Sequence, residues 1–273
     1  ASDEFEYLST IRANHKIKSF SFSLNKERQE LVRVVCALTT NAFETYSITQ
    51  ATGKEKGSNV MVSNKLVSMD ISGHPTGIRA IGLSSDDALA CTVSKNATKI
   101  WNVESRTCIQ SLSPGPLSSS KQSAAYGLCV TFLPGNSHVI VGTREGHLLI
   151  VDISSGTVVF CEEDAHEAAV WSIDVHRPSS VDGSIVVVTG SADKAVKFWD
   201  IESSGDDESE AEHPVLIHTR TLQMTDDVVA VRFSHALDPS KRLVCVATLD
   251  CTVKVFFEDS LKLFLSLYGH KLP

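Results

Sequence analysis

Short apolar runs, many of them β-branched, alternate with polar positions along most of the chain, and clusters of Gly, Asn, Asp and Ser separate them. Few positions recur at helical spacing, so the pattern predicts many strands joined by tight turns. In the best-defined stretch the expected strands are about Val170–Val175, Ile185–Thr189, Val196–Asp200 and Val215–Leu222. The predicted fold class is therefore all-β.

One segment, Val187–Asp200, defines a frame in which two strands flank a polar turn. The large apolar residue closing each copy of this frame is Trp101, Val151, Trp199 or Phe256, at steps of 50, 48 and 57 residues. Gly-His-like pairs precede the copies, namely Gly73-His74, Ala165-His166, Gly269-His270 and a degenerate Asn14-His15. The repeat resembles the WD-repeat family, whose blades span about 40–45 residues, with somewhat enlarged loops.

That resemblance implies a WD-repeat β-propeller with about five four-stranded blades, forming part of a larger, tandem propeller protein. One such sheet cannot bury both faces alone, so blades stack on one another. The blades are expected at about 17–73, 74–125, 126–166, 167–225 and 226–270. Residues 1–16 are expected to supply a strand of a preceding blade (about Phe5–Ala13) and a linker, and residues 271–273 to begin a following blade.

Four side chains of the fourth predicted blade, His166, Thr189, Asp193 and Trp199, include the hydroxyl, imidazole and carboxylate of a hydrolase site. The family resemblance implies a different role, a hydrogen-bonded structural tetrad in which the carboxylate orients the imidazole and the hydroxyl links it to the indole. Such a network satisfies every polar group in a buried place. The tetrad interpretation is favoured over catalysis.

The other frames depart from this pattern. Lys95 or Asn96, and Glu145, stand at the turn position of Asp193, and no histidine precedes Val228, so incomplete tetrads are expected there. The sequence has no phosphate-binding loop, nucleophile elbow or HExxH zinc motif. No catalytic site, cofactor or metal is therefore predicted.

Charge and cysteine content narrow the function classes. Lys plus Arg total 25 and Asp plus Glu total 33, giving a net charge of −8 that repels phosphate backbones, so any RNA contact would be local. The seven cysteines lie far apart and mostly in apolar runs, which favours reduced, buried thiols over zinc ligands. Neither a spanning apolar stretch nor a secretory signal is present, so a nuclear or cytoplasmic compartment is expected.

Residues 202–212 are too charged to pack and are expected to form an acidic, disordered surface loop between two strands of a blade. One interpretation is a solvated insertion. The other is a contact for a basic partner, tuned by phosphorylation of Ser203 or Ser209. The contact residues would be Asp206, Asp207, Glu208, Glu210 and Glu212.

Two further polar segments are less specific. The stretch from Ser113 to Ser123 is expected to be a plain linker. Near the start, Arg12, Lys16 and Lys18 fit either a solvated edge or a contact with RNA or protein.

Several segments carry a closer resemblance. They are Asp226–Val231, Thr252–Phe257, Ser266–Pro273, His15–Phe20, Tyr126–Cys129 and Val141–Thr143. Together they are similar to the WD-repeat proteins of the UTP-B subcomplex of the small-subunit processome. The resemblance implies a non-enzymatic nucleolar scaffold in 18S rRNA maturation.

The partners implied are other processome proteins, including further WD-repeat subunits, with the U3 small nucleolar particle and pre-rRNA contacted mainly indirectly, and no membrane. The alternative in another class is a WD-repeat adaptor that presents a peptide or substrate to a ligase or kinase complex.

Overall fold

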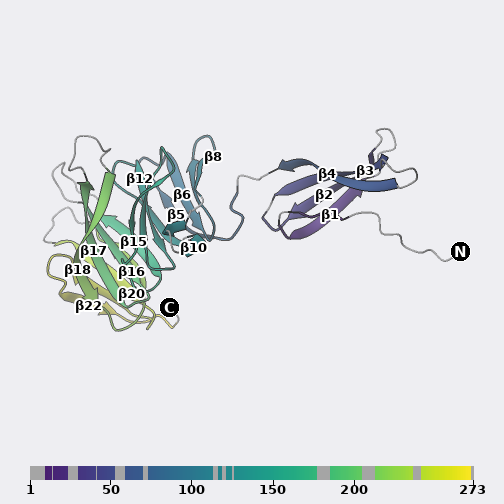
Figure 1. The fold of residues 1–273 in the computed structure, drawn as a ribbon. Coiled ribbons are helices and arrows are strands. Elements are labelled where there is room, and N and C mark those ends of the chain that lie inside the picture. Colours follow the sequence, from purple (N-terminus) through teal and green to yellow (C-terminus); the bar gives the residue numbers. More distant parts are fainter. Residues whose placement is uncertain are drawn as a thin grey trace. The chain divides into compact units, whose positions relative to one another are not determined.

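The computed structural model describes residues 10–13, 15–23, 30–40, 42–52, 59–69, 73–112, 116–118, 121–124, 126–176, 185–204, 213–235 and 241–271. All regular elements of these residues are strands apart from one isolated helical-turn position (Figure 1), and five antiparallel sheets have four strands each. The prediction of an all-β chain with about five four-stranded sheets is therefore confirmed. The chain divides into two compact units, Ala1–Pro75 and Thr76–Pro273.

The first unit holds one sheet. Its strands are β1 (Ile17–Ser23), β2 (Glu30–Leu38), β3 (Phe43–Thr52) and β4 (Asn59–Met69), paired in chain order. A small core packs around Cys36, Leu38 and Tyr46. The Tyr46 hydroxyl donates to the buried Glu44 carboxylate (2.6 Å), and the Lys65 ammonium pairs with the same carboxylate.

The second unit holds four sheets, each a meander of consecutive strands. Their strands are β5 (Ile78–Leu83), β6 (Leu89–Ser94), β7 (Thr98–Asn102) and β8 (Thr107–Leu112); β11 (Gly127–Phe132), β12 (His138–Thr143), β13 (Leu148–Asp152) and β14 (Val158–Glu162); β15 (Val170–His176), β16 (Val186–Ser191), β17 (Ala195–Ser204) and β18 (His213–Gln223); and β19 (Val228–Phe233), β20 (Leu243–Thr248), β21 (Val253–Phe257) and β22 (Leu263–Leu267).

The first strands of neighbouring sheets lie side by side, so that β5 contacts β11, β11 contacts β15 and β15 contacts β19. Polar contacts reinforce the last of these pairs. The Ser172 hydroxyl accepts a hydrogen bond from the Val231 amide (3.1 Å), and the Asp174 carboxylate accepts one from the Phe233 amide (2.7 Å). The four sheets thus stack in sequence around their innermost strands.

Apolar side chains fill the spaces between neighbouring sheets. One cluster joins β11–β14 to β15–β18 through Cys129, Ile140, Val170 and Val187, and a second joins β15–β18 to β19–β22 around Phe198 and Val231. The packing therefore agrees with the expectation that neighbouring blades bury one another's faces.

Two sequence expectations need correction. The segment from Ser113 to Ser123, expected to be a plain linker, contains a short antiparallel pair, β9 (Pro116–Ser118) with β10 (Lys121–Ala124). The expected acidic loop begins too early at residue 202, because β17 continues through Ser204, where it pairs with His213 of β18. Backbone hydrogen bonding of the long hairpin outweighs the polar character of these residues.

The remaining expectations fall largely outside the described residues. This holds for residues 1–9 of the expected preceding strand, for residues 205–212 of the acidic loop, and for residues 272–273. Residues 10–13 are described and form no strand. Within the described part of the chain, no helix has the length and apolar character needed to cross a membrane.

Candidate functional site

The structure brings His166, Thr189, Asp193 and Trp199 together in one chain of hydrogen bonds. The Trp199 indole N–H donates to Thr189 Oγ1 (2.9 Å), which lies 2.7 Å from His166 Nε2. His166 Nδ1 lies 2.8 Å from Asp193 Oδ2. A consistent set of protons places one on Nδ1, donated to the carboxylate, and lets the threonine hydroxyl donate to Nε2.

Sheet β15–β18 positions all four groups. Thr189 lies on β16 and Trp199 on β17, Asp193 lies in the turn between these strands, and His166 precedes β15. Asp193 also accepts hydrogen bonds from the amides of Glu167 (3.1 Å) and Ala195 (2.9 Å). One carboxylate therefore orders the turn, the segment before the first strand and the imidazole.

Burial decides what this arrangement can do. The threonine is fully buried, with 0% relative exposure, and the histidine is 4% exposed, so no substrate can reach the hydroxyl without local opening. Burial lowers the pKa of His166, an effect that the neighbouring Asp193 charge only partly offsets. Burial of Asp193 disfavours its ionisation, but His166 and two backbone amides hold the pKa of the carboxyl below its ordinary value.

Equivalent positions in the other sheets of the second unit are filled in two ways. In β5–β8, the Trp101 indole donates to Thr92 Oγ1 (2.7 Å), a pair like that of Trp199 and Thr189. In the remaining two sheets both positions are apolar and buried, as Val141 with Val151 and Val246 with Phe256. The sequence pattern predicted that some turns lack an equivalent of Asp193. It did not predict that β5–β8 keeps the hydroxyl–indole pair.

In the last three sheets, the turn after the second strand contains one residue with a left-handed backbone. Gly146 (φ +95°), Lys194 (+66°) and Cys251 (+65°) occupy this place. A Cβ on Gly146 would lie 2.1 Å from the His166 carbonyl oxygen, so the glycine is required there by close approach as well as by φ. Asp250 stabilises the last of these turns by accepting from the Thr252 amide (3.1 Å).

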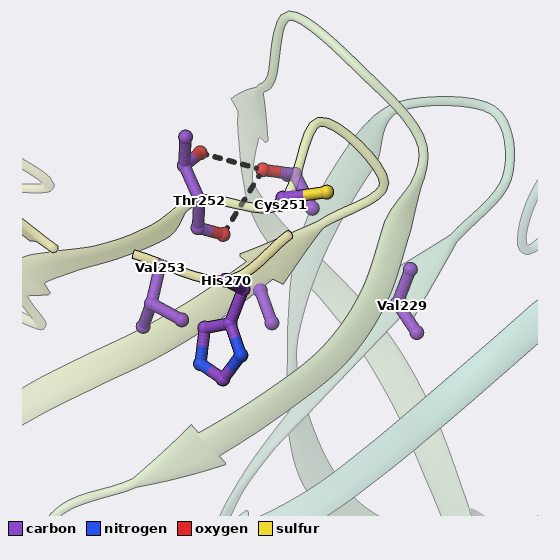
Figure 2. A pocket seen from close by; sticks show the side chains of 7 residues that line it. Val229, Cys251, Thr252, Val253 and His270 are labelled. Atoms are coloured by element: carbon purple, nitrogen blue, oxygen red, sulfur yellow. Dashed lines mark hydrogen bonds between the residues drawn. The ribbon is translucent and has the colours of Figure 1, made fainter. Parts of the chain in front are cut away.

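A pocket of about 130 Å³ lies beside this last turn (Figure 2). Its lining is mostly apolar, and the His270 imidazole and Cys251 thiol do not point toward one another (Figure 2). The Cys251 thiol instead lies 3.8 Å from the Leu249 carbonyl oxygen. The Cys251 thiol and the His270 imidazole therefore do not form a nucleophile–base pair.

Among the remaining candidate residues of segment 202–212, only Ser203 lies in the described part of the chain. Ser203 is exposed on β17, whereas Ser209 and the five acidic residues of the expected partner contact, Asp206, Asp207, Glu208, Glu210 and Glu212, lie outside the described residues. All seven cysteines are free thiols, and burial raises the pKa of Cys129 to about 12 and of Cys161 to about 11. Among described residues, no group of three metal-ligating side chains is close enough to hold an ion.

Comparison with known proteins identifies a family that this chain matches. A family model described as the WDR3 second β-propeller domain matches residues 77–273, nearly the same span as the second unit. The chain is 39% identical over 270 residues to the U3 small nucleolar RNA-associated protein 12 of Saccharomyces cerevisiae, covering 97% of the chain. It is 36% identical over 271 residues to WD repeat-containing protein 3 of Homo sapiens, covering 99% of the chain.

The chain spans 26% of the length of each of these two relatives. Solved structures give the same fold at lower identity. A structure of U3-55K matches with a TM-score of 0.56 and 22% identity, over 73% of this chain and 54% of that one. A crystal structure of RRP9 WD40 repeats matches with a TM-score of 0.55 and 22% identity, over 72% and 53%. The four sheets of the second unit therefore have the fold of WD-repeat propeller blades.

Proposed function

Because the chain belongs to the family of WDR3 second β-propeller domains, we propose that it is a non-enzymatic scaffold in small ribosomal subunit biogenesis, acting in 18S rRNA maturation. The observation that carries the proposal is the similarity over 97% of the chain to a protein named for association with the U3 small nucleolar RNA. The human relative of similar coverage carries the WD-repeat name.

The geometry of the tetrad supports a non-catalytic role. Its hydroxyl is sealed from solvent, its imidazole is held by Thr189 and Asp193, and its carboxylate is committed to the turn. These groups use their hydrogen-bonding capacity to fix blade geometry, which is what a rigid docking surface needs.

The proposed partners are other processome proteins, including other WD-repeat subunits. The net charge of −8 favours contact with proteins over direct contact with a phosphate backbone, so pre-rRNA and the U3 particle would be reached mainly through other subunits. The proposed location is the nucleolus. All of these statements concern the longer protein of which the relatives are examples, since the chain spans 26% of their length.

Sedimentation of the tagged full-length protein from cell extract tests the proposal. We expect the protein to move with large pre-ribosomal particles and to shift to slower fractions after ribonuclease treatment. Recovery only in complexes the size of a ubiquitin ligase or kinase assembly would reject the ribosomal role and favour the adaptor alternative.

A further inference from the structure

Each innermost strand of the second unit carries a β-bulge at the same place. The register shifts occur between Ile78 and Ala80, Gly127 and Cys129, Val170 and Ser172, and Val228 and Ala230. The bulge residues are therefore Arg79, Leu128, Trp171 and Val229. A bulge leaves its residue outside the ladder and redirects the side chain, and bulges are common beside functional sites.

The turn after each second strand lies at this same edge of the sheets. The amides of Arg144, Ala192 and Leu249 donate to carbonyl oxygens just before the innermost strands, at 2.8, 3.0 and 2.9 Å. Lys95 occupies the matching turn of β5–β8, next to Ser94, which pairs with Ile78. We call the set of bulge and turn residues the bulge edge.

Exposed side chains of two kinds lie along the bulge edge. Its β5–β14 half carries the exposed cations Arg79, Lys95 and Arg144, with one exposed acid, Glu145. Its β15–β22 half carries three exposed large apolar side chains, Trp171 (48%), Val229 (40%) and Leu249 (46%), beside the exposed charged turn residues Lys194 and Asp250.

Two of the cations are organised around one tyrosine. Arg79 Nε donates to the Tyr126 hydroxyl (2.9 Å), and the guanidinium carbons of Arg79 and Arg144 lie 5.7 and 5.9 Å from the centre of the Tyr126 ring. Neither arginine has a carboxylate partner among the described ion pairs. The Glu145 carboxylate nearby accepts from the Tyr126 amide (3.2 Å) instead.

We propose that the bulge edge binds an extended acidic segment of a partner protein, with carboxylates on Arg79 and Arg144 and apolar side chains on Trp171 and Val229. The tyrosine holds the two guanidinium groups in place while their outer N–H edges stay free for bidentate bonds to carboxylates. Arg, Tyr and Trp are also the residues that dominate binding energy at protein interfaces.

The same geometry disfavours RNA. The Tyr126 ring is already engaged by two guanidinium groups, so it is not free to stack on a base. Three cations are few for binding an RNA backbone, because affinity for RNA rises with each phosphate that the protein neutralises. Asp226 and Asp227 lie just before β19 and repel carboxylates, so the acidic end of the segment lies toward Arg79 and Arg144.

The inference deepens the proposed scaffold role and rests on it for the class of partner. Fluorescence anisotropy of the full chain with a labelled peptide, about four glutamates followed by alternating leucines and serines, tests it. We expect salt-sensitive binding that Arg79→Glu and Arg144→Glu each weaken by about tenfold or more and that Trp171→Ala also weakens. Lys262→Glu, the control, makes the same charge reversal in the turn after β21, at the opposite edge, and should leave affinity unchanged.

Melting curves identify any variant that misfolds, and Arg79→Gln with Arg144→Gln then replaces it. Equal binding by wild type and both arginine variants, no binding at about millimolar peptide, or tighter binding of single-stranded oligouridine through these arginines would each overturn the proposal. Peptide binding is measured on the isolated chain, so it tests the bulge-edge site independently of particle association. If the full-length protein associates with particles but the chain does not bind the peptide, the bulge-edge site is rejected and the scaffold role is retained.

Discussion

At the scale of single residues, equivalent positions in the blades hold either a hydrogen-bonded hydroxyl–indole pair or two apolar side chains. Thr189 with Trp199 forms the hydrogen-bonded version, and Val141 with Val151 forms the apolar version. Both leave no hydrogen-bonding group without a partner in the core, which is the condition that burial imposes. A single change that removes one polar member should therefore cost more than its size suggests.

Asp193→Ala should destabilise the chain by about 1–3 kcal/mol, because the His166 imidazole and two backbone amides lose their acceptor. Chemical denaturation measures this. Asp250→Ala is the matched control, since Asp250 occupies the same turn position but has no imidazole partner, and it should cost less. Equal stability losses in the two variants, or none for Asp193→Ala, would show that the network does not stabilise the blade.

His166 should make stability depend on pH. Its pKa lies below the usual 6.5 in the folded chain, because burial disfavours the imidazolium, so below about pH 6.5 the unfolded state binds the extra proton. Stability is therefore expected to fall as pH drops from about 7.5 to 5.5, and less steeply in His166→Gln. Melting temperatures across this range provide the readout. Parallel pH profiles for wild type and variant would contradict the lowered pKa.

The tetrad could be expected from the sequence because the repeated frame resembles the WD-repeat family, and that resemblance implies a hydrogen-bonded role for residues at these offsets. The Arg79–Tyr126–Arg144 cluster could not. Arg79 and Tyr126 are 47 residues apart and meet because sheet β5–β8 stacks on sheet β11–β14, whereas Tyr126 and Arg144 are 18 residues apart and meet at one edge of sheet β11–β14. An arginine in a strand of alternating apolar and polar residues does not indicate which side chains it will contact in the folded chain.

At the scale of elements, alternation of apolar and polar residues located the strands but not where they end or bulge. β17 extends to Ser204 because its partner β18 continues the ladder to His213, a pairing that no local pattern reveals. Each of the four bulges likewise adds one residue to its strand, and the alternation of apolar and polar residues does not mark where. Strand pairing across the sheet, rather than local preference, sets these features.

Replacement of residues 205–212 by Asn-Gly should leave folding intact. Ser204 and His213 are directly paired, so a two-residue turn can join the strands, and the deleted sequence is too charged to contribute a core. We expect an unchanged circular dichroism spectrum and a melting temperature within a few degrees. Loss of β-sheet signal would mean that this segment is a structural element.

At the scale of the whole molecule, the chain is two compact units, of which the second coincides with the matched propeller domain. The repeat and the closer resemblance anticipated the family. The sequence did not predict that the four stacked sheets would bring exposed arginines and large exposed apolar side chains to one edge. Which side chains become neighbours depends on which strands lie side by side, and the repeated frames alone do not indicate this.

Mature rRNA levels after depletion of the full-length protein test the scaffold role most directly. We expect 18S rRNA to fall while large-subunit rRNA is retained. Re-expressed full-length protein should restore 18S rRNA, whereas a version lacking residues 77–273 should not. Equal loss of both rRNAs, or full recovery without this segment, would contradict the claim that this propeller serves small-subunit assembly.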